Sequence, residues 1–259
     1  MKTLIITALF DINRQTKGDG RTIDEYLIWF GKTLQLKVDI VIYTEKKFEE
    51  FILEKRKINS NKTTVIIQKL EEIPFYSNND KIKNIISSND YLLKMKDTKR
   101  VECILSEYNI IQYSKFGWLT NATKLSDDYD FYFWMDAGCS RFFDDFDLNN
   151  KWPNESKIIT NKITIQCNQN FLSMFETMKI DDYIWDNNCM LVGTLFGGDK
   201  ESILILEDKI NEAFDFMVKN NCINNEQFSL TIIAKENENF FNIIKPINNN
   251  HLSLFKVIS

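Results

Sequence analysis

The segment after residue 130 holds the residues whose types and spacing are best suited to chemistry. An apolar, aromatic run at residues 131–135 ends in Asp136, and Ala137, Gly138 and Arg141 follow. A carboxylate can hold a divalent metal or a ribose hydroxyl, and an arginine can hold phosphate. Small residues let a ligand approach the backbone closely. The segment therefore favours a nucleotide-diphosphate site, and the alternative is a buried strand that ends in an ordinary acidic turn.

Acidic residues also follow two other predicted strands. Asp11 comes directly after an apolar strand at residues 3–10, and Glu45 comes just after a strand at 38–43. In a parallel sheet the carboxyl ends of the strands lie along one edge, beside the crevice in which such sheets bind ligands. We therefore expect Asp11, Glu45 and Asp136 to lie along one crevice.

Basic residues near these acids are candidates for binding phosphate. Arg14 and Arg21 follow the first predicted strand, and Lys115 lies on a predicted helix. Together with Arg141 they could offset the charge of a diphosphate. Each of them is also open to the alternative of a solvated surface charge. No G-x-G-x-x-G or P-loop motif follows the first strand, which argues against those two classes of nucleotide-binding fold.

Two further segments are candidates for binding a sugar. The paired glycines Gly197 and Gly198 end a predicted strand and leave room for a flat, polar ligand, unless they only form a tight turn. Glu226 and Gln227 begin a predicted helix, whose dipole favours a carboxylate at that end. Glu226 could accept a hydrogen bond from a hydroxyl group or act as a base. The alternative is simple helix capping.

His251 is the only histidine and lies in a polar loop of the tail. Imidazole is an acceptable ligand for Mn²⁺, so His251 could join Asp136 at a metal. The alternative is an ordinary surface histidine.

Composition limits the other classes of function. The net charge of −5 argues against a nucleic-acid partner. The five cysteines are odd in number and show no C-x-x-C spacing, so we expect reduced thiols in a cytoplasmic protein. No stretch reaches the ~18 apolar residues of a membrane span, and the apolar N-terminus is interpreted as a first strand.

The predicted elements alternate between strand and helix in the first half of the chain. This order indicates a largely parallel sheet covered on both faces. The expected strands are at 3–10, 38–43, 63–68, 130–135, near 157–166 and 190–198, with a short one within 240–259. A capping box at Thr22–Glu25 predicts the start of the first helix. The other expected helices occupy 46–56, parts of 79–124, a stretch near 168–178, 200–219 and a segment beginning at Asn224.

Four sequence blocks, taken in their order along the chain, resemble the HtrL/YibB-like family, which is grouped with the glycosyltransferases of bacterial surface-polysaccharide loci. The blocks are Thr7-Ala-Leu-Phe-Asp-Ile-Asn-Arg14, Tyr43-Thr-Glu45, Phe133-Trp-Met-Asp-Ala-Gly138 and Gly193-Thr-Leu-Phe-Gly-Gly198. The resemblance spans roughly residues 3–235. It implies one GT-A domain over residues 1–259, which is an α/β, Rossmann-like fold with a mixed, mostly parallel sheet flanked by helices. It also implies hexosyl transfer from a nucleotide-diphosphate sugar, such as a UDP-sugar, to a saccharide or other hydroxyl acceptor.

The resemblance also implies roles for particular residues. Asp136-Ala-Gly138 is similar to the Asp-x-Asp signature of GT-A enzymes, with Gly138 in place of the second acid, so Asp136 and His251 are the expected ligands of Mn²⁺ or Mg²⁺. The Phe-Gly-Gly segment is similar to the sugar-binding segment of retaining members. Asp136 and Glu226 are the expected catalytic residues. The expected nucleotide-sugar-binding residues are Thr7, Asp11, Arg14, Arg21, Tyr43, Lys115, Asp136, Ala137, Gly138, Arg141, Gly197, Gly198 and Gln227.

Two other classes of function stay open. The first strand and its Asp11 resemble the start of a haloacid-dehalogenase-type phosphatase, in which an aspartate at this position attacks phosphate. That pattern has a second aspartate where Asn13 stands, and a threonine one position before Thr16. The missing second acid at Gly138 is also compatible with a domain that binds a nucleotide-sugar or glycan without turning it over.

Overall fold

One seven-stranded sheet organises the computed structural model, which describes residues 1–143, 148, 151–247 and 250–259. The strand order is β3-β2-β1-β4-β6-β5-β7. Neighbouring strands are parallel except for the two pairs that β6 forms, with β4 and with β5. The strands are β1 (Thr3–Leu9), β2 (Asp39–Thr44), β3 (Thr63–Ile67), β4 (Phe131–Met135), β5 (Ile163–Cys167), β6 (Leu191–Gly198) and β7 (Phe241–Ile244). The expected mixed, mostly parallel sheet is confirmed.

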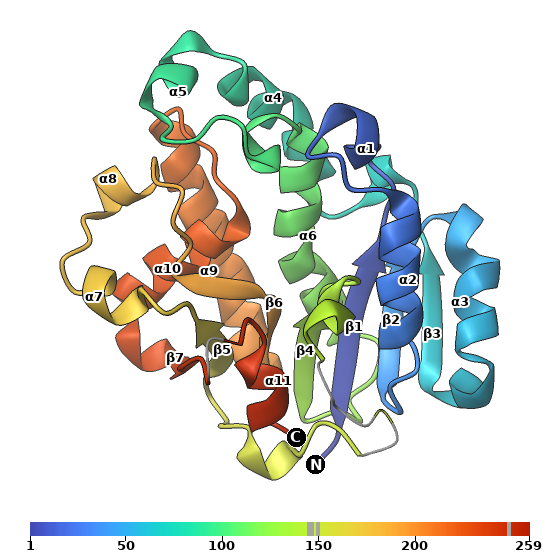
Figure 1. The fold of residues 1–259 in the computed structure, drawn as a ribbon. Coiled ribbons are helices and arrows are strands. Elements are labelled where there is room, and N and C mark those ends of the chain that lie inside the picture. The colour runs from blue at the N-terminus through green and yellow to red at the C-terminus, as the bar shows by residue number, and fades with distance from the viewer. Residues whose placement is uncertain (144–147, 149–150, 248–249) are drawn as a thin grey trace.

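Helices cover both faces of this sheet, as Figure 1 shows. The helices whose apolar residues pack with one face are α4 (Asn79–Ile86), α6 (Ser106–Ala122), α9 (Lys200–Lys219) and α10 (Glu226–Glu236). Those on the opposite face are α2 (Ile23–Thr33), α3 (Glu49–Lys55) and α11 (Ser253–Val257). The remaining α-helices are α1 (Arg14–Lys17), α5 (Asn89–Lys94), α7 (Phe171–Phe175) and α8 (Ile180–Tyr183). Because both faces are covered, all residues of β1 and β4 are buried.

Trp118 of α6 is the centre of an aromatic stack beneath the carboxyl edge of the sheet. Its ring stacks on Phe10 at 5.6 Å, on Tyr43 at 5.5 Å and on Trp134 at 5.8 Å between ring centroids. Such offset ring pairs stabilise a core beyond the area they bury. The stack fixes the ends of β1, β2 and β4 against one helix, and so fixes the residues that follow these strands.

The local signals in the sequence placed most elements correctly. The capping box is present, since Thr22 accepts a hydrogen bond from the backbone N–H of Glu25 and Glu25 accepts one from that of Thr22. The N-cap of α10 is Asn225, one residue later than expected, and its side chain accepts from the N–H of Gln227 at 3.1 Å. The tail helix α11 was not predicted. Within the described residues, no helix combines the length and the apolar character that crossing a membrane requires.

The direction of β6 is the main departure from expectation. The strand ends at Gly198, as expected, but it runs antiparallel to both of its neighbours, β4 and β5. Gly197 lies opposite Phe133 in the β4–β6 pair, and a side chain there would meet the carbonyl oxygen of Tyr132 at 2.2 Å. At Gly198 a side chain would meet the carbonyl oxygen of Lys162 at 2.7 Å. These glycines therefore allow three strands to pair closely.

Candidate functional site

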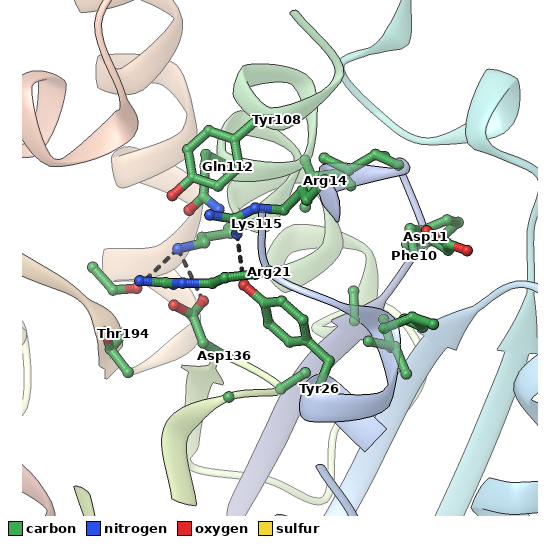
Figure 2. Close-up of a pocket in the computed structure, with 18 of the residues that line it drawn as sticks. Phe10, Asp11, Arg14, Arg21, Tyr26, Tyr108, Gln112, Lys115, Asp136 and Thr194 are labelled. Carbon is green, nitrogen blue, oxygen red and sulfur yellow. Dashed lines mark hydrogen bonds and ion pairs between the residues drawn. The ribbon is translucent and has the colours of Figure 1, made fainter. Parts of the chain in front are cut away.

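A pocket of about 270 Å³ lies beyond the carboxyl ends of β1 and β4, between α6 and the first turn of α10. We call it the edge pocket. Figure 2 shows that Arg14, Arg21, Lys115 and Asp136 point toward one another there, although they come from different parts of the chain. The predicted site residues that line the edge pocket are Asp11, Arg14, Arg21, Lys115, Asp136, Ala137, Gly138, Arg141, Glu226 and Gln227.

The floor of the edge pocket is a lysine shared by two carboxylates. The Lys115 ammonium lies 2.7 Å from Glu226 Oε1, 3.0 Å from Asp136 Oδ1 and 3.0 Å from the carbonyl oxygen of Gly193. An ammonium group has three N–H donors, so these partners occupy all of them. Lys115 was expected to hold phosphate, but it instead holds two carboxylates together from a position that is 1% exposed.

Asp136 and Glu226 differ in their access to the pocket. The side chain of Asp136 is 31% exposed, whereas that of Glu226 is 1% exposed. Asp136 Oδ1 also accepts a hydrogen bond from the indole N–H of Trp134 at 2.7 Å. Oε2 of Glu226 is buried without a hydrogen-bond partner among the described residues. A ligand in the edge pocket therefore meets Asp136 first, and Glu226 lies behind it.

Burial and charge set the protonation of this cluster. Burial raises the pKa of Glu226 to about 7, although the nearby Lys115 ammonium favours the charged form. For Lys115 burial works in the opposite direction, but the carboxylates of Asp136 and Glu226 outweigh it and raise its pKa. Lys115 is therefore charged at neutral pH, whereas Glu226 has a pKa near neutral pH.

Gly193 makes room for the buried carboxylate. A side chain at this position of β6 would meet Glu226 Oε1 at 2.2 Å and Cγ of Gln227 at 3.1 Å. The neighbouring Thr194 accepts a hydrogen bond at its carbonyl oxygen from the backbone N–H of Asp136, at 2.9 Å. The start of β6 thus positions both acids. Gly193 and Thr194 were missed as site residues because the sequence does not reveal which end of this strand reaches the pocket.

Arg14 is held rigidly in the wall of the edge pocket. Two of its nitrogens donate to the two carboxylate oxygens of Asp19, at 3.0 and 2.6 Å, and a third donates to the hydroxyl of Tyr26 at 2.6 Å. The guanidinium lies 4.7 Å from the ring centroid of Tyr108. Burial alone would lower the pKa of Arg14, but Tyr26 and Asp19 raise it. Tyr26 and Tyr108 were also missed, because their spacing was consistent with helix cores.

Arg21 and Arg141 are the cations of the edge pocket that are open to a ligand. Arg21 is 42% exposed and lies 3.5 Å from Asp19, which it shares with Arg14. Arg141 is exposed, stacks on the ring of Trp29 at 4.6 Å and donates from Nε to the carbonyl oxygen of Gly138. A planar guanidinium with unused donors is well suited to bind phosphate oxygens.

Asp11 lies at the rim of the edge pocket and points away from Asp136, as Figure 2 shows. Its carboxylate lies 3.3 Å from the Lys47 ammonium and accepts from the N–H of Asn13. The carboxylate of Glu45 accepts from the N–H of Asp11 at 2.7 Å. The acids that follow β1 and β2 therefore meet, but they form an ion-pair cluster with Lys47 beside the pocket.

Several other predicted site residues lie elsewhere. Thr7 and Tyr43 are buried within β1 and β2, and the hydroxyl of Tyr43 donates to the carbonyl oxygen of Trp118. Gly197 and Gly198 lie inside the sheet, because β6 runs antiparallel to β4 and takes them away from Asp136. None of these four lines the edge pocket.

The expected metal ligands do not assemble. His251 packs against Phe142 and lines a different cavity, which Asp136 does not line. Asp136 Oδ1 is already engaged by Lys115 and Trp134, and Gly138 supplies no second acid. Within the described residues there is no group of three histidine, cysteine, aspartate or glutamate side chains suited to a metal. The residues present therefore do not fit the Mn²⁺ or Mg²⁺ site that the family resemblance implied.

Comparison with known proteins places the chain in a family. Residues 1–259 match the model of a family described as "Bacterial protein of unknown function (HtrL_YibB)", which confirms the resemblance seen in the sequence. No sequence among the curated proteins matches the chain.

The chain also matches solved structures, at low sequence identity. Mouse xyloside xylosyltransferase 1 in its apo form is 9% identical, with a TM-score of 0.44 over 94% of this chain and 84% of that one. A 4-diphosphocytidyl-2C-methyl-D-erythritol synthase from Anaerococcus prevotii is 11% identical, with a TM-score of 0.41 over 96% and 90%. The inositol-1-phosphate CTP transferase from T. maritima is 11% identical, with a TM-score of 0.38 over 100% and 95%.

Proposed function

We propose that this protein, which belongs to the HtrL/YibB family of bacterial proteins, transfers a sugar from a nucleoside-diphosphate donor to a hydroxyl acceptor. The observation that carries the proposal is the make-up of the edge pocket. Open guanidinium groups and a partly exposed carboxylate face the same space at the carboxyl edge of the sheet, where α/β folds bind ligands. Cationic and acidic groups on one small volume suit a ligand that has both a diphosphate and hydroxyl groups.

The diphosphate of the donor would lie against Arg21 and Arg141. Both have donors available, whereas Arg14 is already bonded to Asp19 and Tyr26. Negative charge grows on the diphosphate as its bond to the sugar breaks, and fixed cations stabilise that charge. In this proposal the arginines do the work that a metal does in other transferases of this chemistry.

Asp136 is the group that meets the reacting hydroxyl. The acceptor oxygen forms a bond to the anomeric carbon of the sugar, and the bond from that carbon to the diphosphate oxygen breaks with its electron pair. The proton of the acceptor hydroxyl passes to the Asp136 carboxylate and from there to solvent. Lys115 and Glu226 are positioning residues, because they hold Asp136 from behind and have almost no exposure of their own.

Binding of the donor is tested by thermal unfolding with UDP, GDP, CDP and ADP and their sugar derivatives, each with and without Mn²⁺. A ligand that binds only the folded state raises the melting temperature. We expect a rise with one nucleoside diphosphate that Arg21→Ala removes. The control Lys219→Ala, at the exposed end of α9, should retain it. No rise with any nucleotide would refute the donor site, and a rise only with Mn²⁺ would refute the metal-free clamp.

Turnover separates the proposal from its alternatives. With the nucleotide-sugar that raises the melting temperature most, we expect slow hydrolysis that releases nucleoside diphosphate. Asp136→Asn should reduce the rate of this hydrolysis at least tenfold while donor binding persists. Tight binding with no release would identify a binding protein. Hydrolysis of a generic aryl phosphate, lost in Asp11→Asn, would identify a phosphatase instead.

A further inference from the structure

A second cavity, lined mainly by amide side chains, opens at the same edge of the sheet as the edge pocket. We call it the amide pocket. Its lining comes from the end of β5 and the residues after it, from the segment that precedes β6, and from Pro246, Asn250 and His251 after β7. Because β4 and β5 are both antiparallel to β6, they run in the same direction, and their carboxyl ends lie at one edge. The polar side chains of this lining include Gln166, Gln169, Asn170, Asn187, Asn188 and His251.

Two buried or half-buried amides build the frame of the amide pocket. Gln166 is 1% exposed; it donates to the carbonyl oxygen of Asn250 at 2.9 Å and accepts from the N–H of Leu254 at 2.8 Å. Asn168 donates to the carbonyl oxygen of Cys189 at 2.7 Å. These bonds join the tail loop to β5 and β5 to the segment before β6, so the walls are fixed to one another.

Other polar side chains on this frame are turned to solvent or lack a protein partner. Gln169, Asn187, Asn188 and His251 are exposed. The Oδ1 atom of Asn170 is buried and has no hydrogen-bond partner within the part of the chain that the structure describes. The cavity therefore offers amide and imidazole groups that the fold itself does not use fully.

The chemistry of this lining indicates an uncharged ligand rich in hydroxyl groups. A side-chain amide offers both donors and acceptors in a fixed plane, which matches a hydroxyl group that both donates and accepts. No carboxylate, ammonium or guanidinium group is among the described residues that line the amide pocket. It thus differs from the edge pocket, whose arginines suit a diphosphate.

The start of β6 and the N-cap of α10 separate the two cavities. Cys189 lines the amide pocket and lies beside the N-cap residue Asn225, with 3.7 Å between Asn225 Nδ2 and Cys189 Sγ. The next residue, Glu226, lines the edge pocket, as does Gly193. Residues 189 and 193 are four steps apart in the chain, and four steps span at most about 13 Å even when the chain is fully extended. A saccharide of a few units could therefore occupy the amide pocket and reach Asp136.

We propose that the amide pocket binds a neutral saccharide and is the acceptor subsite of the transfer reaction. The role of this saccharide as the acceptor rests on the proposed function. Saccharide binding at the amide pocket does not depend on that function.

The experiment is saturation-transfer difference NMR on the full chain with neutral mono- and disaccharides of glucose, galactose, xylose and N-acetylglucosamine. It is run with and without the nucleoside diphosphate that binds best. The variant is Gln169→Ala with Asn187→Ala, since both side chains are exposed and their removal should have little effect on stability. The matched control is Asn61→Ala with Asn84→Ala, two exposed amides outside the pocket.

We expect at least one saccharide to bind the natural protein and the control, and its affinity to fall about tenfold in the pocket variant, as the loss of a few hydrogen bonds implies. Absence of saccharide binding, or binding that the pocket variant retains, would overturn the inference. Nucleotide binding is measured on the same samples by thermal shift. If nucleotide binds and saccharide does not, only the acceptor subsite fails; if saccharide binds and nucleotide does not, the donor site fails.

Discussion

Replacing Glu226 by glutamine should change how the stability of this protein depends on pH. The carboxyl group is buried beside Lys115, and burial raises its pKa from the ordinary 4.5 to about 7. Between these values the unfolded chain has lost a proton that the folded chain keeps. The stability that Glu226 contributes is thus complete below the unfolded pKa and is lost as the pH rises through about 7.

The size of the effect follows from the two pKa values. With an unfolded value of 4.5 and a folded value of about 7, the contribution of Glu226 falls by roughly 2 kcal/mol between about pH 5.5 and about pH 8. For a chain of this size, that corresponds to a melting temperature about 4–8 °C lower at the higher pH. Glutamine keeps the shape and an oxygen that can accept from Lys115 but does not titrate. The variant should therefore lack this fall.

The assay is urea unfolding of the natural protein and the variant at both pH values. Burial raises the pKa of Asp19 and Asp186, but their hydrogen bonds and cationic partners outweigh it and lower the pKa. These two carboxyl groups therefore titrate below this pH range and do not contribute to the change in stability. The control is Asp127→Asn, an exposed partner of Lys200, which should show the same pH dependence as the natural protein. Equal pH dependence of the natural protein and Glu226→Gln would refute the raised pKa of Glu226.

Three other changes test the remaining geometry. Gly193→Ala forces a methyl group against the Glu226 carboxylate and should lower the free energy of unfolding in urea by about 1–3 kcal/mol. The control Gly138→Ala, whose methyl group would meet nothing closer than 3.5 Å, should lower it by less than about 0.5 kcal/mol. Similar losses in the two variants would contradict the tight fit at Gly193. Arg14→Lys keeps the charge but loses the two-pronged contact with Asp19, and should destabilise the fold by about 1 kcal/mol; an unchanged urea midpoint would argue against that contact. His251→Ala should leave nucleotide binding and its response to Mn²⁺ unchanged, because His251 lies outside the edge pocket; a lost Mn²⁺ response would restore the metal site.

Much of the fold followed from local patterns. Buried apolar runs gave the strands, and the capping box gave the start of α2. The β-α-β order implied parallel pairing of β1, β2 and β3, and their carboxyl ends do share an edge. Arg14 and Arg21 follow β1, and Asp136 follows β4, which pairs parallel with β1. For this reason these residues could be assigned to one pocket from the sequence.

The features that the sequence could not reveal depend on contacts between distant segments. An apolar run looks the same whether its strand runs parallel or antiparallel, so the sequence could not show that β6 brings Gly193 rather than Gly197 to the pocket. Tyr43 lies near a strand end in the sequence, but its ring stacks on Trp118 and is therefore buried in the core. His251 depends on the path of a tail loop that no local signal specifies.

The sequence by itself determined which elements form and which charged groups follow the parallel strands, because helix periodicity, strand burial and capping act over a few neighbouring residues. Only the tertiary structure decided that Lys115 pairs with both Asp136 and Glu226, which lie on a strand end and a helix start far apart in the chain. A lysine on a helix is normally solvated, and it becomes the link between two acids only when packing removes water from all three groups.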